Sequence, residues 1–179
     1  MIMNLLQKVR NILSPIQEET LDALRRRGVI IGTNVTIYSS DIDQGHGFLI
    51  EIGNNVTITH AAILAHDAST KNALGYSKVG KVKIGNDVFI GYGSIILPGV
   101  TIGDNVIVGA GTVIRRDVPA DSVVIGNPAQ IICKTDEYIQ KNRMRMNTVP
   151  VYQTYWKDKT EEEKQQMIVE LENTIGFDV

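Results

Sequence analysis

Aliphatic side chains return every six residues through the middle of the chain. The clearest run is Ile84, Ile90, Ile96, Ile102, Val108 and Ile114. Four positions after each of these stands a small or β-branched residue: Val88, Ser94, Val100, Val106, Thr112 and Val118. A helix repeats near 3.6 residues and a strand repeats at 2, so neither element explains a sustained period of six. The pattern predicts a triangular solenoid, in which each hexapeptide is one strand with one corner and three hexapeptides form a coil.

The same period extends towards the N-terminus with more irregularity. The matching positions are Ile52, Ile58 and Leu64, with Val56 and Ala62 as companions, and then Ile31 and Ile37 with Val35. Gly-Asn-Asn, Gly-Asn-Asp and Gly-Asp-Asn, at 53–55, 85–87 and 103–105, suit corners because Gly and Asn tolerate positive φ. With coils stacked at about 4.8 Å, we expect roughly five coils in a prism about 24 Å tall.

The period is interrupted twice, and a histidine lies at an end of each interruption. The longer one follows His66 directly and predicts a loop over 67–82 that leaves the prism as a lid. The shorter one, 40–46, ends at His46. We expect stacking of the coils to bring the shorter interruption near His66.

The segments on either side of the repeat have helical patterns. Residues 1–28 predict an N-terminal helical segment, with a capping box at Ser14–Gln17 and Gly28 as its end. Residues 134–179 predict a C-terminal helical tail, with one helix opening at Thr160–Glu163. The expected organisation is therefore 1–28, a β-helix over 29–133 that includes the loop, and 134–179.

Composition excludes some classes of function. A net charge of −2 and a pI near 5.9 lack the basic footprint that nucleic-acid binding needs. With Cys133 as the only cysteine, no intramolecular disulfide forms, which predicts a reducing, cytoplasmic location. Gln7, Lys8 and Arg10 interrupt the apolar N-terminal stretch, so we expect neither a signal peptide nor a spanning helix, and membrane contact that is at most peripheral.

The repeat resembles the hexapeptide-repeat acyltransferases, and within them the branch of sugar O-acetyltransferases that act on galactosides or maltose. The matching stretches are His66–Thr70, Gly80–Gly85, Ile90–Ser94, Leu97–Asn105, Val108–Gly111, Asp117–Pro119 and Ile125–Ala129. The resemblance covers about residues 29–133 and implies a mainly β fold, the left-handed parallel β-helix. General rules for crossovers would predict right-handed connections, so the handedness comes from the resemblance.

This resemblance implies an acetyl-CoA-dependent O-acetyltransferase of polysaccharide biosynthesis, with a sugar or glycan acceptor and a homotrimeric assembly. In that branch the histidine before the loop is the general base, which corresponds to His66. One imidazole suits this reaction because a thioester is already activated and the hydroxyl only has to lose its proton. A backbone N–H, by position that of Tyr92, would stabilise the tetrahedral oxyanion.

The resemblance also places acetyl-CoA in a groove between two prisms. Tyr92 and Ala110 match positions that contact the pantetheine arm, and Arg115 and Arg116 stand where the coenzyme's phosphates bind. Two positions depart from the family pattern: Phe89 stands where tryptophan is common, and Gln130 replaces a basic residue whose charge Lys134 would supply.

The acceptor site is less defined by the sequence. Asp41 and Asp43 are candidates for binding sugar hydroxyls, with a plain turn as the alternative interpretation. The group that orients His66 is either Asp67, although adjacent residues of a strand face opposite sides, or a backbone carbonyl.

Other functions also fit parts of the sequence. The three histidines, His46, His60 and His66, suggest a γ-class carbonic anhydrase-like metalloenzyme if all three imidazoles converge. A non-catalytic scaffold, another acyl carrier and N-acylation of an amino sugar are further alternatives. The transferase interpretation requires no metal.

Overall fold

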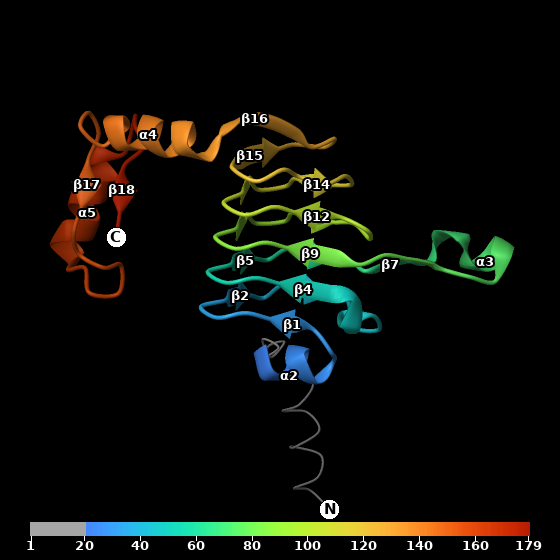
Figure 1. Ribbon diagram of the computed structural model, residues 1–179. Helices are drawn as coiled ribbons and strands as arrows, with labels where there is room; N and C mark the ends of the chain where they lie inside the picture. Colours follow the sequence, from blue (N-terminus) through green and yellow to red (C-terminus); the bar gives the residue numbers. More distant parts are fainter. Residues whose placement is uncertain (1–20) are drawn as a thin grey trace, which may run out of the picture. The chain divides into compact units, whose positions relative to one another are not determined.

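The computed structural model describes residues 21–179, so the predicted helix and capping box before Leu21 lie outside the described part (Figure 1). The chain divides between Cys133 and Lys134 into two compact units. The first contains the six-residue repeat and the second contains the C-terminal residues.

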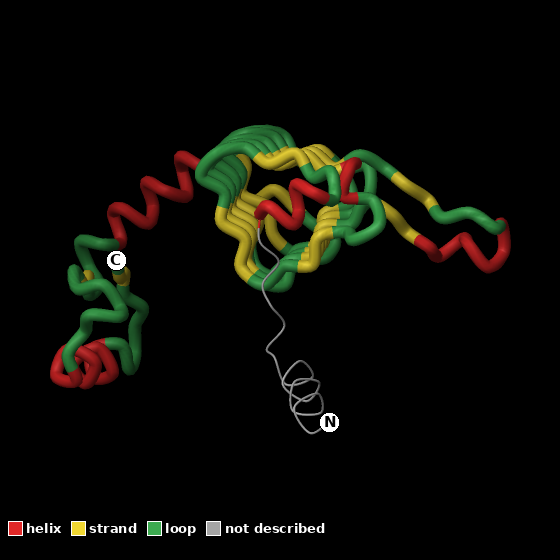
Figure 2. The backbone as a smooth tube through the Cα atoms, turned by 90° about the horizontal axis from the view of Figure 1, so that it is seen from below, coloured by secondary structure: helices red, strands yellow, loops and turns green. Residues whose placement is uncertain are grey.

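The first unit is a solenoid of three sheets built mainly of parallel strands, and Figure 2 shows its three-sided outline along the stack. One sheet has the order β1 (Ile30–Ile31), β4 (Ile50–Ile52), β9 (Val82–Ile84), β12 (Thr101–Ile102). The second has the order β2 (Thr36–Tyr38), β5 (Thr57–Thr59), β10 (Phe89–Ile90), β13 (Ile107–Val108), β15 (Ser122–Ile125), β16 (Gln130–Lys134). The third has the order β3 (Asp41–Ile42), β6 (Ala62–Ile63), β11 (Ile95–Ile96), β14 (Val113–Ile114). The triangular solenoid that the period predicts is confirmed.

The inward-facing aliphatic residues form columns along the solenoid. Ile58, Ile90 and Val108 are aligned in neighbouring strands, and all three are fully buried. These columns are the core, because each coil is too thin to bury an apolar face without the coils above and below it.

The predicted register is wrong by one residue on the third side of the second coil. Ile63, with 0% of its surface exposed, pairs with Ile96, whereas the predicted Leu64 is only half-buried. The buried companion is likewise Ala61 rather than Ala62. The corner before Ile63 is one residue shorter than the corner before Ile96, and it turns at His60, with φ +45°, instead of at a glycine.

A second corner carries a ladder of polar side chains. Five of its residues have φ between 53° and 56°: Asn34, Asn55, Asp87, Asn105 and Asp121. The amide of Asn34 donates to Asn55 on the next coil at 3.0 Å, and that of Asn55 donates to Asp87 at 2.9 Å. The asparagines of the Gly-Asn pattern therefore link successive coils as well as turning the chain.

Helix α2 (Leu21–Arg26) covers the N-terminal end of the stack (Figure 1). Leu24 is 1% exposed and belongs to the hydrophobic core. The Arg25 guanidinium donates to the carbonyl oxygen of Gly32 at 3.5 Å, and that of Arg27 donates to the carbonyl oxygen of Ile42 at 3.1 Å. The helix thus covers the end of the core, and Arg25 within it and Arg27 just after it bind carbonyl groups in the first coil.

Both interruptions leave the solenoid at the corner between the third and first sheets. The shorter contains the 3₁₀ turn η1 (Gly47–Leu49). The longer contains β7 (His66–Asp67), η2 (Ala68–Thr70), α3 (Lys71–Leu74) and β8 (Lys78–Val79), and we call residues 66–79 the arm. Strands β7 and β8 pair antiparallel, and the arm extends away from its own solenoid (Figures 1 and 2). The predicted lid therefore does not cover a cleft of its own chain.

The C-terminal unit contains α4 (Thr135–Arg145), β17 (Val151–Tyr152), α5 (Glu161–Glu170) and β18 (Phe177–Asp178). Thr160 and Glu163 form the predicted capping box of α5. The parallel pairing of β17 with β18 was not predicted, since each strand has only two residues. Within the described residues, none of the helices is long and apolar enough to cross a membrane.

Candidate active site

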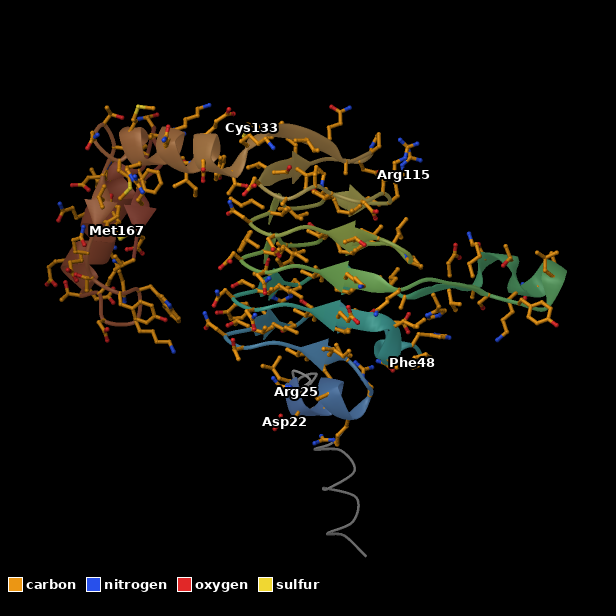
Figure 3. All side chains as sticks on the ribbon, in the orientation of Figure 1. Asp22, Arg25, Phe48, Arg115, Cys133 and Met167 are labelled. Carbon is orange, nitrogen blue, oxygen red and sulfur yellow. The ribbon has the colours of Figure 1, made fainter. Side chains whose placement is uncertain are left out.

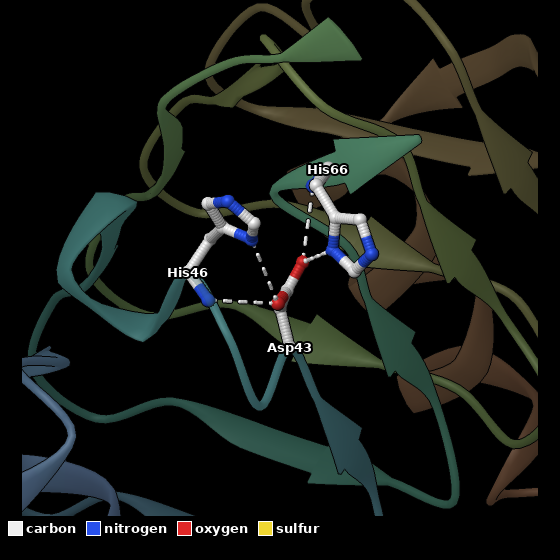
Figure 4. Close-up of side chains that lie close together, drawn as sticks. All are labelled: Asp43, His46 and His66. Atoms are coloured by element: carbon white, nitrogen blue, oxygen red, sulfur yellow. Dashed lines mark hydrogen bonds and ion pairs between the residues drawn. The ribbon is translucent and has the colours of Figure 1, made fainter. Parts of the chain in front are cut away.

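The two interruptions bring His66 and Asp43 together at one corner (Figure 4). Strand β3 pairs with β6 at an offset of 21 residues, which places Asp43 beside the segment that leads into His66. The His66 Nδ1 lies 2.5 Å from Asp43 Oδ2. Nδ1 carries the proton in this bond, because an ionised carboxylate only accepts.

Asp43 is held in place by backbone groups from both interruptions. Its Oδ1 accepts from the N–H groups of Gly45 and His46, and its Oδ2 accepts from those of Ala65 and His66. The side chain has no exposed surface. Burial alone would raise the pKa of Asp43, but the hydrogen bonds from the His66 side chain and from backbone N–H groups outweigh it and lower the pKa to about 2.

This arrangement answers the question of what orients His66. The carboxylate of Asp67 accepts from the backbone N–H of Ser69 at 2.8 Å and pairs with Lys78 at 2.5 Å, which holds the pKa of Asp67 below its usual value. Asp43, an acceptor-binding candidate in the sequence, has no surface free to contact a sugar. The sequence could have indicated that Asp43 lies near His66, because the two interruptions follow neighbouring strands of one sheet, β3 and β6.

A second imidazole lies beside the pair. The ring centroid of His46 is 4.8 Å from that of His66, and the His46 Nδ1 is 3.6 Å from Asp43 Oδ1. The ligand atoms of Asp43, His46 and His66 all lie within 4.8 Å of one another, as in some metal sites. A zinc ion needs about 2 Å to each ligand, so the 2.5 Å between Asp43 and His66 would have to widen to admit one.

The third histidine occupies a different corner. His60 stacks on Tyr92 with a centroid distance of 4.8 Å, at the corner between the second and third sheets. The three imidazoles therefore do not converge within one chain.

Arg115, which Figure 3 labels, and Arg116 follow β14, so they lie at the same corner as His66, two coils further along the stack. They line a cavity of about 550 Å³ together with Asp117, Val118, Val124 and residues 128–131. The structure thus places the predicted phosphate-binding arginines and the predicted base along one edge of the solenoid.

Tyr92 and Ala110 lie on the edge that carries His60. The backbone carbonyl of Tyr92 accepts from Gly111, which follows Ala110 on the next coil. Ser39, Asp41, His60 and Tyr92 line a second cavity of about 280 Å³, so Asp41 is separated from Asp43. The predicted site residues consequently divide between two edges of the chain.

The remaining predicted positions lie elsewhere. Phe89 is exposed on the outer face of the second sheet, and Gln130 lines the cavity beside the two arginines. Lys134 ends β16 at the boundary with the C-terminal unit and precedes α4.

Comparisons with known proteins agree with this architecture. Residues 81–116 match the family model of the bacterial transferase hexapeptide, described as six repeats. The chain is 45% identical to Protein CapG of Staphylococcus aureus over 127 residues, which are 67% of this chain and 74% of that protein. It is 43% identical to a putative acetyltransferase, YvoF, of Bacillus subtilis over 89 residues, or 49% of each chain.

Solved structures of acetyltransferases are also similar to this chain. A galactoside acetyltransferase in complex with coenzyme A aligns with a TM-score of 0.50 and 29% identity, covering 63% of this chain and 58% of that one. A hexapeptide-repeat acetyltransferase from Vibrio cholerae aligns with a TM-score of 0.52 and 24% identity over 70% of this chain and 85% of that one, which shows the shared fold. With its parallel sheets, its repeat and these relatives, the chain has the left-handed parallel β-helix fold, belongs to the bacterial hexapeptide-repeat transferases and is an acetyltransferase of that family.

Proposed function

We propose that the protein transfers an acetyl group from acetyl-CoA to a hydroxyl group of a sugar in a polysaccharide precursor, with His66 as the general base. The observation that carries this proposal is the hydrogen bond from His66 Nδ1 to the buried Asp43. It fixes the tautomer, so the unprotonated Nε2 is the nitrogen available to an acceptor, and the side chain is 37% exposed.

The reaction needs one base and no acyl-enzyme. Nε2 of His66 removes the hydroxyl proton as the oxygen attacks the thioester carbonyl, and the resulting imidazolium is stabilised by Asp43. Collapse of the tetrahedral intermediate breaks the carbon–sulfur bond, and the coenzyme thiolate takes the proton from Nε2. Cys133 lies at the boundary between the two units, away from this corner, and has no part in these steps.

Acetyl-CoA binds in a groove between two copies of the chain. Arg115 and Arg116 share an edge with His66, whereas Tyr92 and Ala110 lie on another edge, so a site built from both sets needs two chains. A closed homotrimer supplies three such grooves. Arg115 and Arg116 bind phosphates of the coenzyme, and backbone groups of Tyr92 and Ala110 contact its pantetheine arm.

Two further parts of the proposal concern location and acceptor. A cytoplasmic location fits the need for acetyl-CoA and the single cysteine. The sugar acceptor draws support from the similarity to the galactoside acetyltransferase. Asp41, in the second cavity, is the candidate that remains accessible for binding a sugar hydroxyl.

Release of the coenzyme thiol in the presence of a panel of sugars tests this function. His66→Ala should lower kcat by about 10²- to 10⁴-fold because the base is lost, while the KM for acetyl-CoA stays within about twofold. Lys83→Ala, on the outer face of the first sheet, serves as the control and should retain activity. Wild-type activity in His66→Ala would refute the role of His66, and bound zinc without thiol release would favour a metalloenzyme.

A further inference from the structure

The imidazole of His46 has no role in the reaction above, although it contacts both members of the pair. Figure 4 shows the Asp43 carboxylate between the rings of His46 and His66. The planes of the two rings are tilted by 33°. Phe48 follows on the other side of His46, with 6.0 Å between ring centroids.

The contact between His46 and Asp43 is not a hydrogen bond of the imidazole. Its Nδ1 is buried and, at 3.6 Å from Asp43 Oδ1, has no hydrogen-bond partner among the described residues. The backbone N–H of His46 donates to Asp43 instead, at 2.9 Å. The ring is therefore held beside the carboxylate by its backbone and by packing.

Water would weaken the pair if it reached Asp43. The attraction between a carboxylate and an imidazolium falls as the local dielectric rises. The side chain of Asp43 has no exposed surface, whereas those of His46 and His66 are 32% and 37% exposed. The two imidazoles thus stand between the carboxylate and solvent.

We propose that His46 is a positioning residue for the general base, whose ring shields the Asp43 carboxylate from water and packs against His66. This inference rests on the proposed function of His66. The ring acts through its shape, because its buried nitrogen makes no hydrogen bond. A flat side chain without that nitrogen, such as phenylalanine, should therefore fulfil the role of the His46 ring, whereas the methyl group of alanine should not.

Other charged groups around His46 do not supply this effect. Arg27 packs against Gly47 and binds the carbonyl oxygen of Ile42, and Asp67 pairs with Lys78 beyond His66. Neither contact involves the side chain of His46. Asp43 and His66 are the titratable groups that face the His46 ring directly.

The test compares His46→Ala with His46→Phe. The alanine variant should lose about 3- to 10-fold in kcat with little change in the KM for acetyl-CoA, because water reaches Asp43 and the imidazolium of His66 is stabilised less. The phenylalanine variant should stay within about twofold of wild type, with a melting temperature that is equal or higher since a buried nitrogen without a partner is removed. Both variants lack the titration of His46, so a difference between them reports on shape alone.

A second readout does not require activity. In a histidine ring NMR titration, the midpoint for His66 should move to lower pH by about half a unit or more in His46→Ala and should stay in place in His46→Phe. Asp22→Asn, an exposed change on α2, is the control for both measurements. An unmoved midpoint in the alanine variant, or equal losses in both variants, would overturn the inference. A shifted midpoint in a protein that releases no thiol would instead refute only the acetyl-transfer function.

Discussion

At the scale of single residues, the feature that matters most is a buried carboxylate held by four backbone N–H groups and one imidazole. Each hydrogen bond favours the ionised form, and together they overcome the cost of burial. Asp43 is therefore ionised at neutral pH. A fixed negative charge beside His66 is what a base needs when it accepts a proton during the reaction.

The lowered pKa of Asp43 also makes a prediction about stability. Because its folded pKa of about 2 lies below the usual 3.8, the carboxylate stabilises the fold above about pH 4, and this contribution is lost as the pH falls towards 2. Urea unfolding at pH 7 should show Asp43→Asn to be less stable than wild type by about 2 kcal/mol. The difference should shrink between pH 4 and pH 3, and a gap that is independent of pH would contradict the assignment.

Arg116 allows a prediction about binding. If the guanidinium contacts a phosphate of the coenzyme, Arg116→Ala should weaken acetyl-CoA binding by about 1–2 kcal/mol, a loss of roughly 5- to 30-fold in affinity. Calorimetry with the purified protein measures it. Arg26→Ala, which removes an arginine from α2, is the matched control, and equal affinity in both variants would exclude Arg116 from the phosphate site.

At the scale of elements, the six-residue repeat predicts the order of strands and corners, and the places where the repeat is irregular decide which residues are buried. The corner at His60 is one residue short, which moves the buried position from Leu64 to Ile63. Ile63→Ala should consequently cost about 2–5 kcal/mol of unfolding free energy, because it leaves a cavity in a fully buried column. Leu64→Ala should cost clearly less in the same denaturation experiment. A larger loss for Leu64→Ala than for Ile63→Ala would mean that Leu64 is the buried residue, as the repeat predicted.

The period predicted the solenoid because six-residue spacing has few structural solutions, and it predicted that both interruptions stack near His66. It did not reveal the Asp43–His66 pair, because that contact depends on an offset of 21 residues that the two irregular coils set. The direction of the arm was also beyond the pattern, since its exposed residues, such as Leu74 and Tyr76, carry no periodic signal. The helices of the C-terminal unit were readable from their caps, whereas two-residue strands have no sequence signature.

At the scale of the whole molecule, the predicted site residues lie on two different edges of the solenoid, and a site that uses both edges needs an oligomer. If one chain supplies the edge with His66 and another the edge with Tyr92, activity requires more than one copy. Sedimentation should give about three times the chain mass of 19.7 kDa, and dilution below the dissociation range should abolish thiol release. A fully active monomer would contradict the shared groove.

Helix α2 has a consequence for how the protein behaves at high concentration. A stack of parallel strands ends in a row of unpaired backbone groups, and such an edge is a template on which another stack can continue, as in fibrils. Leu24 of the helix packs into the core, and Arg25 and Arg27 bind the carbonyl groups of Gly32 and Ile42, so this end of the stack is covered. Removal of α2 should therefore expose an edge at which two copies of the chain can pair, and such a variant should aggregate at lower protein concentration than the wild type.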